Sequence, residues 1–290
     1  AWGRRFAPLS NWIADTGAGR YFNERVLGLD PRRPLPTFAR RTFCETWDAP
    51  SSPGDIALFA DTFSNYFEPE HLRAAARLAG RLSARVELAP PICCGRPLIS
   101  KGLLDEAAHQ AAATTRALLP LAERGTPILF CEPSCYSAVC DDHPLLLRGA
   151  AQTQARQVAA ACQLFDGWAA VAIKSADLAL QSGPRQVLVH GHCHQKALVG
   201  TGATSALLAA IPDSQIVALD SGCCGMAGLF GYEHYELSRA IGERRLFPAV
   251  REAGSGIAVV ATGFSCRQQI AHFTGVTAHS PATLIESLSS

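Results

Sequence analysis

The sequence predicts an α/β protein made of two duplicated, pseudo-symmetric halves, each with a parallel sheet flanked by helices. Short runs rich in Val, Ile, Leu and Phe alternate with Ala/Leu/Arg-rich segments, a pattern typical of buried parallel strands covered by helices. Paired cysteine motifs recur at a fixed distance along the chain. The composition agrees with a packed core, because 48% of the 290 residues are hydrophobic and only 18% are charged.

The first segment, residues 1–53, differs from the rest of the chain. Within 1–43 there are eight Arg against three acidic residues, a net charge of +5, and a proline-rich stretch, DPRRPLP, follows at 30–36. Proline favours extended backbone in the residue before it and ends helices. We therefore expect an Arg/Pro-rich lead-in and linker that packs on a neighbour, with a solvated linker as the alternative.

Six apolar runs follow, and each ends in a turn and a helical stretch. Three precede residue 150 and three follow it, which predicts a first half over 54–150 and a second half over 151–290. The runs predict strands over 55–61, 85–90, 126–135, 186–193, 215–224 and 256–266.

The cysteines repeat with the same period as the strands. Cys93 lies 130 positions before Cys223, and Cys135 lies 131 positions before Cys266. Each half also places a Ser-Cys pair at the end of its last strand, 41 or 42 positions after the Cys-Cys doublet. A shared spacing at this period indicates an internal duplication.

The second half has four cysteines at or just past the carboxyl ends of predicted strands. Ligands bind at that edge of a parallel sheet, and helix N-termini there favour thiolate over thiol. Four thiolates suit a tetrahedral zinc ion or an iron–sulfur cluster. Adjacent side chains in extended backbone point apart, so a doublet grips a large cluster more easily than one ion. The four are Cys193, Cys223, Cys224 and Cys266.

Three histidines surround the first of these cysteines in the stretch HGHCHQK. If the strand continues through this stretch, they share one face of it, opposite Cys193. His192 and His194 are candidate extra ligands or hydrogen-bond donors to cluster sulfur, with ordinary structural histidines as the alternative.

The first half has fewer candidate ligands. It lacks a cysteine in the region 61–63, which corresponds to Cys193. Carboxylates are present instead, and oxygen ligands suit single zinc or iron ions better than sulfur-bridged clusters. We expect this site to be degenerate, empty or occupied by another metal. The candidates are Cys93, Cys94, Cys135, Glu132 and Asp61, with Cys131 as a further one.

Bulk properties exclude several functional classes. The formal net charge is only +1, which gives no strong attraction to nucleic acid, and no apolar run reaches the 18 residues of a spanning helix. Eleven cysteines without a visible secretory signal indicate the reducing cytoplasm, where clustered thiols bind metal or do redox chemistry.

At these motifs the chain resembles a known family, the cysteine-rich CCG domain. The stretches DTFSNYFEPE, CCGRPLISKGLLDEA, EPSC, HGHCHQKAL, SGCCGMAGLFGYE and GFSCRQQI are similar to the C-terminal part of fused flavoenzymes that oxidise D-2-hydroxy acids. The family also includes the B subunit of heterodisulfide reductase and the iron–sulfur subunit of glycolate oxidase. Its full motif has five cysteines and supports an unusual iron–sulfur cluster. Here Gly263 and Glu132 occupy the position of the fifth cysteine in the two halves.

The resemblance implies an electron-transfer module. We expect an iron–sulfur cluster of 4Fe-4S type in the second half, with zinc or iron able to bind in either half. FAD would lie only in a partner, and the partners would be FAD-binding and ferredoxin-like domains of a D-lactate, D-2-hydroxyglutarate or glycolate type dehydrogenase. Electrons would pass from flavin toward a quinone or another acceptor. No catalytic residue for substrate chemistry is expected within this oxidoreductase component.

Two other interpretations stay open. One is a zinc-binding structural and docking domain of the same flavoenzyme, and the other is a thiol–disulfide redox domain that uses Cys223 and Cys224. We expect a cytoplasmic location that allows peripheral contact with the inner face of the membrane, and a homo-oligomer is compatible with the sequence.

Overall fold

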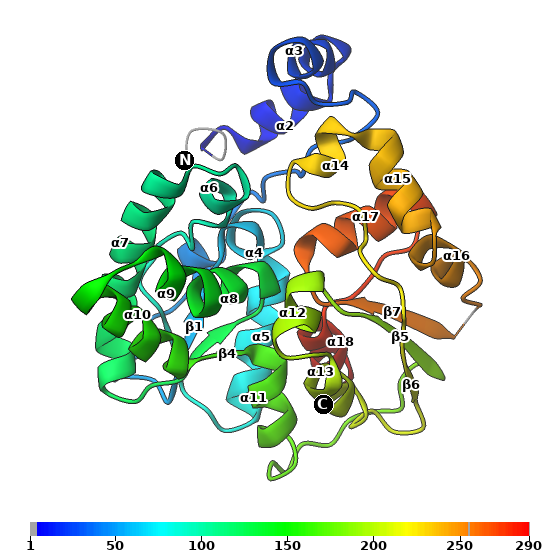
Figure 1. The fold of residues 1–290 in the computed structure, drawn as a ribbon. Helices are drawn as coiled ribbons and strands as arrows, with labels where there is room; N and C mark the ends of the chain where they lie inside the picture. The colour runs from blue at the N-terminus through cyan, green and yellow to red at the C-terminus, as the bar shows by residue number, and fades with distance from the viewer. Residues whose placement is uncertain (1–4, 255, 290) are drawn as a thin grey trace.

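The fold consists of two parallel sheets that lie side by side (Figure 1). The computed structural model describes residues 5–254 and 256–289, so residues 1–4 of the lead-in lie outside it. The four-stranded first sheet has the order β2-β1-β3-β4, and the three-stranded second sheet has the order β6-β5-β7. The strands are β1 (Ile56–Phe59), β2 (Val86–Leu88), β3 (Ile128–Phe130), β4 (Cys162–Leu164), β5 (Gln186–His190), β6 (Gln215–Ala218) and β7 (Ile257–Ala261).

Helices alternate with these strands along the chain, as expected for parallel sheets. The lead-in contains α2 (Ala7–Asp15), α3 (Gly17–Leu27) and the 3-10 turn η1 (Cys44–Thr46). The first half contains α4 (Thr62–Tyr66), α5 (Pro69–Arg81), α6 (Arg96–Ser100), α7 (Leu104–Glu123), α8 (Pro133–Ser137), the π-helical turn η2 (Ala138–Asp142), α9 (His143–Leu146) and α10 (Gly149–Ala161).

The rest of the chain has the same alternation. Its helices are α11 (Phe165–Ala172), α12 (Cys193–Leu198), α13 (Gly202–Leu208), α14 (Phe230–Glu233), α15 (Tyr235–Glu243), α16 (Leu246–Arg251), α17 (Phe264–Thr274) and α18 (Pro281–Leu288).

The strand pairing confirms the α/β prediction. All six predicted strands are present, although the four that were predicted to end in a cysteine all end before it. In both halves the first strand is central and pairs with the next two, which matches an internal duplication. The sequence analysis missed β4, which pairs with β3 and extends the first sheet beyond residue 150. We therefore propose that the halves divide between β4 and β5.

A shared core joins the two sheets. Alternate residues of β1 and β5, such as Leu58 and Val189, point into one cluster with the apolar faces of α5, α11, α13 and α18. The opposite faces of the sheets form separate clusters, the first beneath α7 and α10 and the second beneath α16 and α17. The sheets therefore depend on a common set of buried side chains.

The carboxyl ends of both sheets face each other across a central seam. Figure 1 places α4, α8, α12 and α17 there, between the sheets. Phe63 of α4 stacks on Phe264 of α17, with ring centroids 4.9 Å apart. Buried Arg267 binds Glu68 of the first half with nitrogen–oxygen distances of 2.7 and 2.9 Å. Residues that follow the strands of both sheets therefore contact one another along the seam.

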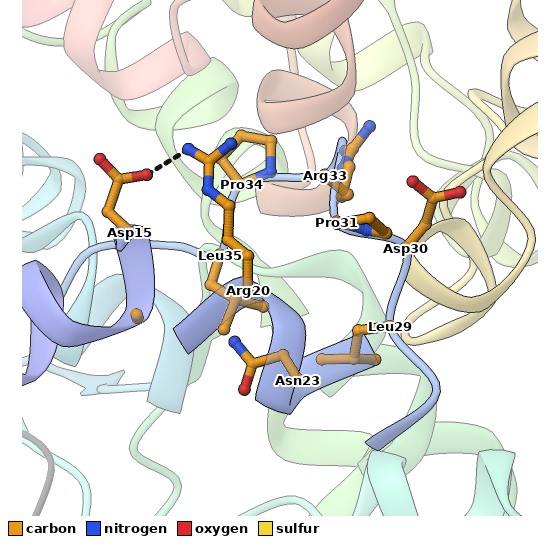
Figure 2. A pocket seen from close by; sticks show the side chains of 10 residues that line it. Asp15, Arg20, Asn23, Leu29, Asp30, Pro31, Arg33, Pro34 and Leu35 are labelled. Carbon is orange, nitrogen blue, oxygen red and sulfur yellow. Dashed lines mark hydrogen bonds and ion pairs between the residues drawn. The ribbon is translucent and has the colours of Figure 1, made fainter. Parts of the chain in front are cut away.

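The lead-in packs on the molecule through its linker rather than its helices. The backbone N–H groups of Asp30 and Ala39 donate to the carbonyl oxygens of Tyr232 and Tyr66 at 2.7 and 2.8 Å. Trp12 and Phe22 of α2 and α3 stay more than half exposed. Figure 2 shows the hollow between these helices and the linker, where Arg20 pairs with Asp15. Among the described residues, no cysteine lines this hollow.

In the part of the chain that the structure describes, no helix has both the length and the apolar character that crossing a membrane requires.

Candidate metal centre

The first turn of the site follows β5. The strand ends at His190, and Cys193 is the first residue of α12. His192 caps this helix, because its Nδ1 accepts from the backbone N–H of His194 at 3.2 Å. The backbone N–H of His192 donates in turn to Oγ1 of Thr262 at 2.9 Å, which fixes the turn against the end of β7. Cys193 is therefore held at the N-terminus of a helix, as the sequence predicts.

The second turn carries the cysteine doublet and needs glycine. Gly222 and Gly225 have φ of 63° and 91°, a region that side chains with a Cβ rarely adopt. A Cβ on Gly225 would lie 2.2 Å from the Ser238 carbonyl oxygen. The backbone N–H of Gly225 points back at Cys223 Sγ, 3.3 Å away. This tight turn lets neighbouring thiols reach the same side of the chain.

Four thiols of the second half form a row. Cys193 hydrogen-bonds with Cys223, and Cys224 hydrogen-bonds with both Cys223 and Cys266. The accepting sulfurs are favoured as thiolates, so the pKa of Cys223 is lowered by Cys193 and that of Cys266 by Cys224. The pKa values of the two donors are raised, in each case first by the bond to Cys223.

Solvent access falls along this row. Cys193 is exposed and Cys223 is partly buried, whereas Cys224 and Cys266 are 5% and 2% exposed. The row therefore begins at the surface and ends in the protein interior, where a thiolate needs a partner of opposite charge.

His190 lies at the buried end of the row. One ring nitrogen of His190 and the sulfurs of Cys224 and Cys266 lie within 4.8 Å of one another. The ring is 1% exposed, and its Nδ1 lies 2.5 Å from Oγ of Ser221. Its Nε2 makes no hydrogen bond of normal geometry to the residues that the structure describes, although the ring lies close enough to Cys266 to help lower the pKa of that thiol, after the larger effect of Cys224. A buried nitrogen of this kind calls for an explanation, because buried polar atoms are normally paired.

The histidines that the sequence singled out lie differently. Because β5 ends at His190, the three histidines do not share one strand face, and that assumption was wrong. The ring of His192 lies against Gly263, where a Cβ would come within 2.4 Å of it. His194 Nδ1 lies 2.6 Å from Oγ of Ser137 in the first half. Burial lowers the pKa of His194 to about 4, with Arg96 adding to the effect.

The first half repeats the doublet turn but has a smaller site. Gly95 has φ of 76°, and its N–H lies 3.4 Å from Cys93 Sγ, as in the second half. Cys94 and Cys135 are buried, with their sulfurs 2.9 Å apart. The Cys94 thiol favours the Cys135 thiolate, but burial and the carboxylates of Asp61 and Glu132 raise the pKa of Cys135 to about 11.

The two carboxylates of the first half have different surroundings. Both oxygens of Glu132 are in use, since Oε1 accepts from Ser134 and Oε2 accepts from the backbone N–H of Phe264 at 2.8 Å. Asp61 uses Oδ1 to cap α4 at Ser64, but its buried Oδ2 has no partner within residues 5–254 and 256–289. Asp61 is therefore the better placed of the two to accept a cation.

The remaining repeat positions explain why the halves differ. Counting 131 residues back, Phe59 corresponds to His190 and Thr62 to Cys193. Phe59 ends β1 and stacks on Phe130 with centroids 4.6 Å apart. The first half thus has an apolar ring where the second half has a ring nitrogen.

The donors of the second half fit a group that bonds several sulfurs at once. The row brings four thiols together. The His190 ring, whose Nε2 is buried and unpaired among the described residues, lies near the two buried cysteines, Cys224 and Cys266. Soft thiolate donors prefer zinc or iron–sulfur groups over Mg²⁺ or Ca²⁺.

The first half fits a cluster less well, because Cys93, Cys94 and Cys135 are joined, among the residues described, only by the free carboxylate oxygen of Asp61. The further candidate, Cys131, belongs to the shared core rather than to the cluster of Cys94 and Cys135.

A residue that sequence reasoning missed lies behind the doublet turn. Arg33 of the linker is 5% exposed and donates to Met226 Sδ at 3.3 Å. Its guanidinium lies over the ring of Tyr232, and its Nη1 has no hydrogen-bond partner in the described part of the chain. The basic pair between two prolines, DPRRP, was the only available signal. This buried cation contributes a positive charge close to Cys224.

Comparison with known proteins identifies the motif. Residues 187–271, from β5 to α17, match the family described as the CCG cysteine-rich domain, and this stretch contains all four cysteines of the second half. The resemblance noted from the sequence is therefore confirmed, and the chain contains a CCG cysteine-rich domain.

The chain is also homologous to curated bacterial proteins. It is 28% identical to the C subunit of the anaerobic glycerol-3-phosphate dehydrogenase of Escherichia coli strain K12, over 97% of this chain and 72% of that protein. It is 28% identical to the D-2-hydroxyglutarate dehydrogenase of the same strain, over 82% of this chain and 23% of the enzyme. With the corresponding enzyme of Pseudomonas putida it is 31% identical, over 76% of this chain and 21% of that enzyme.

Proposed function

We propose that this chain is the iron–sulfur electron-transfer module of an FAD-linked dehydrogenase of the D-2-hydroxy acid type. The observation that carries the proposal is the row of four thiols at the carboxyl edge of the second sheet, inside the region that matches the CCG domain. A 4Fe-4S type cluster, when bound, would accept and return single electrons.

The chain's own residues would prepare the site. The ligands would be Cys193, Cys223, Cys224 and Cys266, two of which favour the thiolate because their neighbours donate hydrogen bonds. The Gly-rich turn and the α12 N-terminus fix the sulfur positions. His192 and His194 would orient this turn through the helix cap and the bond to Ser137, rather than bind metal.

The substrate and the flavin would lie outside these residues. Both types of relative are dehydrogenases or dehydrogenase subunits by name, and the chain spans only 23% and 21% of the D-2-hydroxyglutarate dehydrogenases. We propose FAD-binding and ferredoxin-like domains as partners and a quinone or similar molecule as the acceptor. All eleven cysteines are free thiols, which supports a location in the reducing cytoplasm.

Zinc is the second candidate for the site, and one observation favours it. His190, Cys224 and Cys266 already lie within 4.8 Å of one another, as three of the four donors of a tetrahedral ion would. In that case the chain would be a structural docking domain. Asp61 with Cys93, Cys94 and Cys135 would be the corresponding oxygen-containing zinc or iron site of the first half.

Anaerobic metal analysis separates the two functions. We expect protein purified without oxygen to contain iron and acid-labile sulfide, about four of each per chain, and to give an electron paramagnetic resonance signal when reduced or oxidised. Cys224→Ser should lose the iron and the signal. Cys44→Ser, at a partly buried cysteine outside both motifs, is the matched control and should keep them. Protein that contained zinc but neither iron nor sulfide would contradict the electron-transfer proposal.

A further inference from the structure

The unpaired ring nitrogen of His190 has no role in the iron–sulfur ligand set proposed above. The family's motif has a fifth donor at the position that Gly263 occupies here, and glycine has no side chain to supply one. The space at Gly263 is filled by the ring of His192, whose Cδ2 would clash with any Cβ. Gly263 therefore offers no donor, and the unpaired nitrogen of His190 is the further donor close to the row.

We infer that His190 supplies this donor, and that Nε2 of its ring binds a metal atom of the second-half cluster. The inference rests on the proposed function and assigns one further ligand to the same site. Its basis is that Nε2 is buried and unpaired among the described residues, and that a nitrogen of the same ring lies within 4.8 Å of the sulfurs of Cys224 and Cys266.

The hydrogen bonds around the ring prepare Nε2 for this role. Ser221 Oγ lies 2.5 Å from Nδ1 of His190 and 3.5 Å from the carbonyl oxygen of Leu219. The carbonyl can only accept, so when the hydroxyl donates to it, Nδ1 is the donor to Ser221. With the proton on Nδ1, the Nε2 lone pair is free. Metal-binding histidines commonly carry such a hydrogen bond on the other nitrogen.

The position of His190 is also rigid. As the last residue of the central strand β5, it pairs with Ala261 of β7, and its carbonyl oxygen accepts from Thr262. The ring therefore projects from a sheet rather than a loop, which holds a ligand in place before metal arrives.

The first half provides an internal comparison. Phe59 ends the central strand β1 at the equivalent position and is 1% exposed within an apolar cluster. A phenyl ring cannot bind metal. Nitrogen ligation is therefore specific to the second half. The variant His190→Phe gives the second half the residue that the first half has at this position.

Nitrogen ligation has a measurable consequence for the redox potential. A neutral imidazole donates less negative charge to iron than a thiolate, and replacing thiolates by histidines raises the potential of iron–sulfur centres. We expect His190→Cys to keep the cluster and to lower its midpoint potential relative to the wild-type chain. His190→Phe should lose part of its iron, because one site loses its protein ligand.

The decisive experiment is pulsed electron paramagnetic resonance on the full chain, purified anaerobically and labelled with ¹⁵N-histidine. We expect a strong nitrogen coupling that changes with the label and disappears in His190→Cys. His192→Asn, which keeps a helix-capping oxygen, and His194→Gln should retain it. Thermal melting monitored by circular dichroism shows whether each variant is folded.

The outcomes separate the inference from the proposed function. Absence of iron from the wild-type chain would overturn both. Iron and sulfide without a histidine coupling, a coupling that survives in His190→Cys, or one that vanishes in His192→Asn or His194→Gln, would overturn the ligand assignment alone.

Discussion

Asp61 shows how one buried group can link the first site to pH. Its carboxyl is 1% exposed, and burial, followed by the nearby Glu132 carboxylate, raises its pKa from 3.8 to about 7. An ionised and unpaired carboxylate in the interior costs free energy. The site therefore lacks a positive partner, which either a proton or a metal ion can supply.

In the metal-free chain, the Asp61 carboxyl should make a contribution to stability that falls as pH rises through this range. The difference between the wild-type chain and an Asp61 variant isolates this contribution, because groups such as His194 and Asp166 titrate in both proteins. Folded Asp61 holds its proton up to about pH 7, whereas the unfolded carboxyl releases it near pH 4, so the contribution of Asp61 to the free energy of unfolding falls between these values and levels off above them. Asp61→Asn keeps the cap on α4 and removes this dependence. At pH 8 the variant should be more stable, by up to about 4 kcal/mol.

Urea unfolding of chelator-treated, reduced protein from pH 4 to pH 8 provides the measurement. Parallel stability curves for the wild-type chain and the variant would contradict the assignment of the raised pKa to Asp61.

Single helices and strands were mostly predictable from sequence, and the exceptions have physical causes. β5 and the other predicted strands stand out as continuous apolar runs because both faces of a parallel sheet are buried. β4 was missed because its three residues, CQL, merge with the flanking Ala-rich helices. The doublet turns were found because the glycine pattern required by φ > 0 is local. The roles of His190 and Arg33 depend on contacts between distant segments, which spacing does not reveal.

Glu132 links two elements that are 132 positions apart. It caps α8 through Oε1 and accepts from the first N–H of α17 through Oε2. A carboxylate near a helix N-terminus is favoured by the exposed N–H groups and the helix dipole. The sequence analysis treated it as a metal candidate, yet its hydrogen bonds make it a connection between the two halves.

Removing this carboxylate should destabilise the whole chain. We expect Glu132→Ala to lower the free energy of unfolding by about 3 kcal/mol, since buried hydrogen bonds to a charged group are lost at two helix ends. Glu132→Gln keeps one accepting oxygen and should lose about half as much. Glu123→Ala, at an exposed residue of α7, is the matched control and should change stability by less than about 0.5 kcal/mol. If urea unfolding gave the same free energy of unfolding for Glu132→Ala and Glu123→Ala, Glu132 would not have the structural role assigned to it.

At the scale of the whole molecule, the shared core makes the two halves one folding unit. Side chains of α5 and α11 on the first sheet pack against those of α18 and α13 on the second in one cluster, and the ion pair of Arg267 with Glu68 crosses the seam. The duplicated sequence could suggest two independent domains. The packing instead predicts that neither sheet can lose its partner without exposing apolar surface.

We therefore expect a single unfolding transition. Circular dichroism and tryptophan fluorescence should give the same urea midpoint for the full chain. Leu78→Ala, at a fully buried position of α5, should shift both midpoints together and lower the free energy of unfolding by about 3 kcal/mol. Two separate midpoints, or a shift in only one signal, would mean that the halves unfold independently.

The contrast between Phe59 and His190 has a consequence for how the duplicated halves could change over time. In the first half the equivalent position now fills an apolar core, and the fifth-donor position, Glu132, now fastens the neighbouring half. A reversal at either position would remove packing or a helix cap before any metal was regained. If the proposed function holds, stability opposes a mutational return to two equal sites, and the contribution of the first half at these two positions is structural.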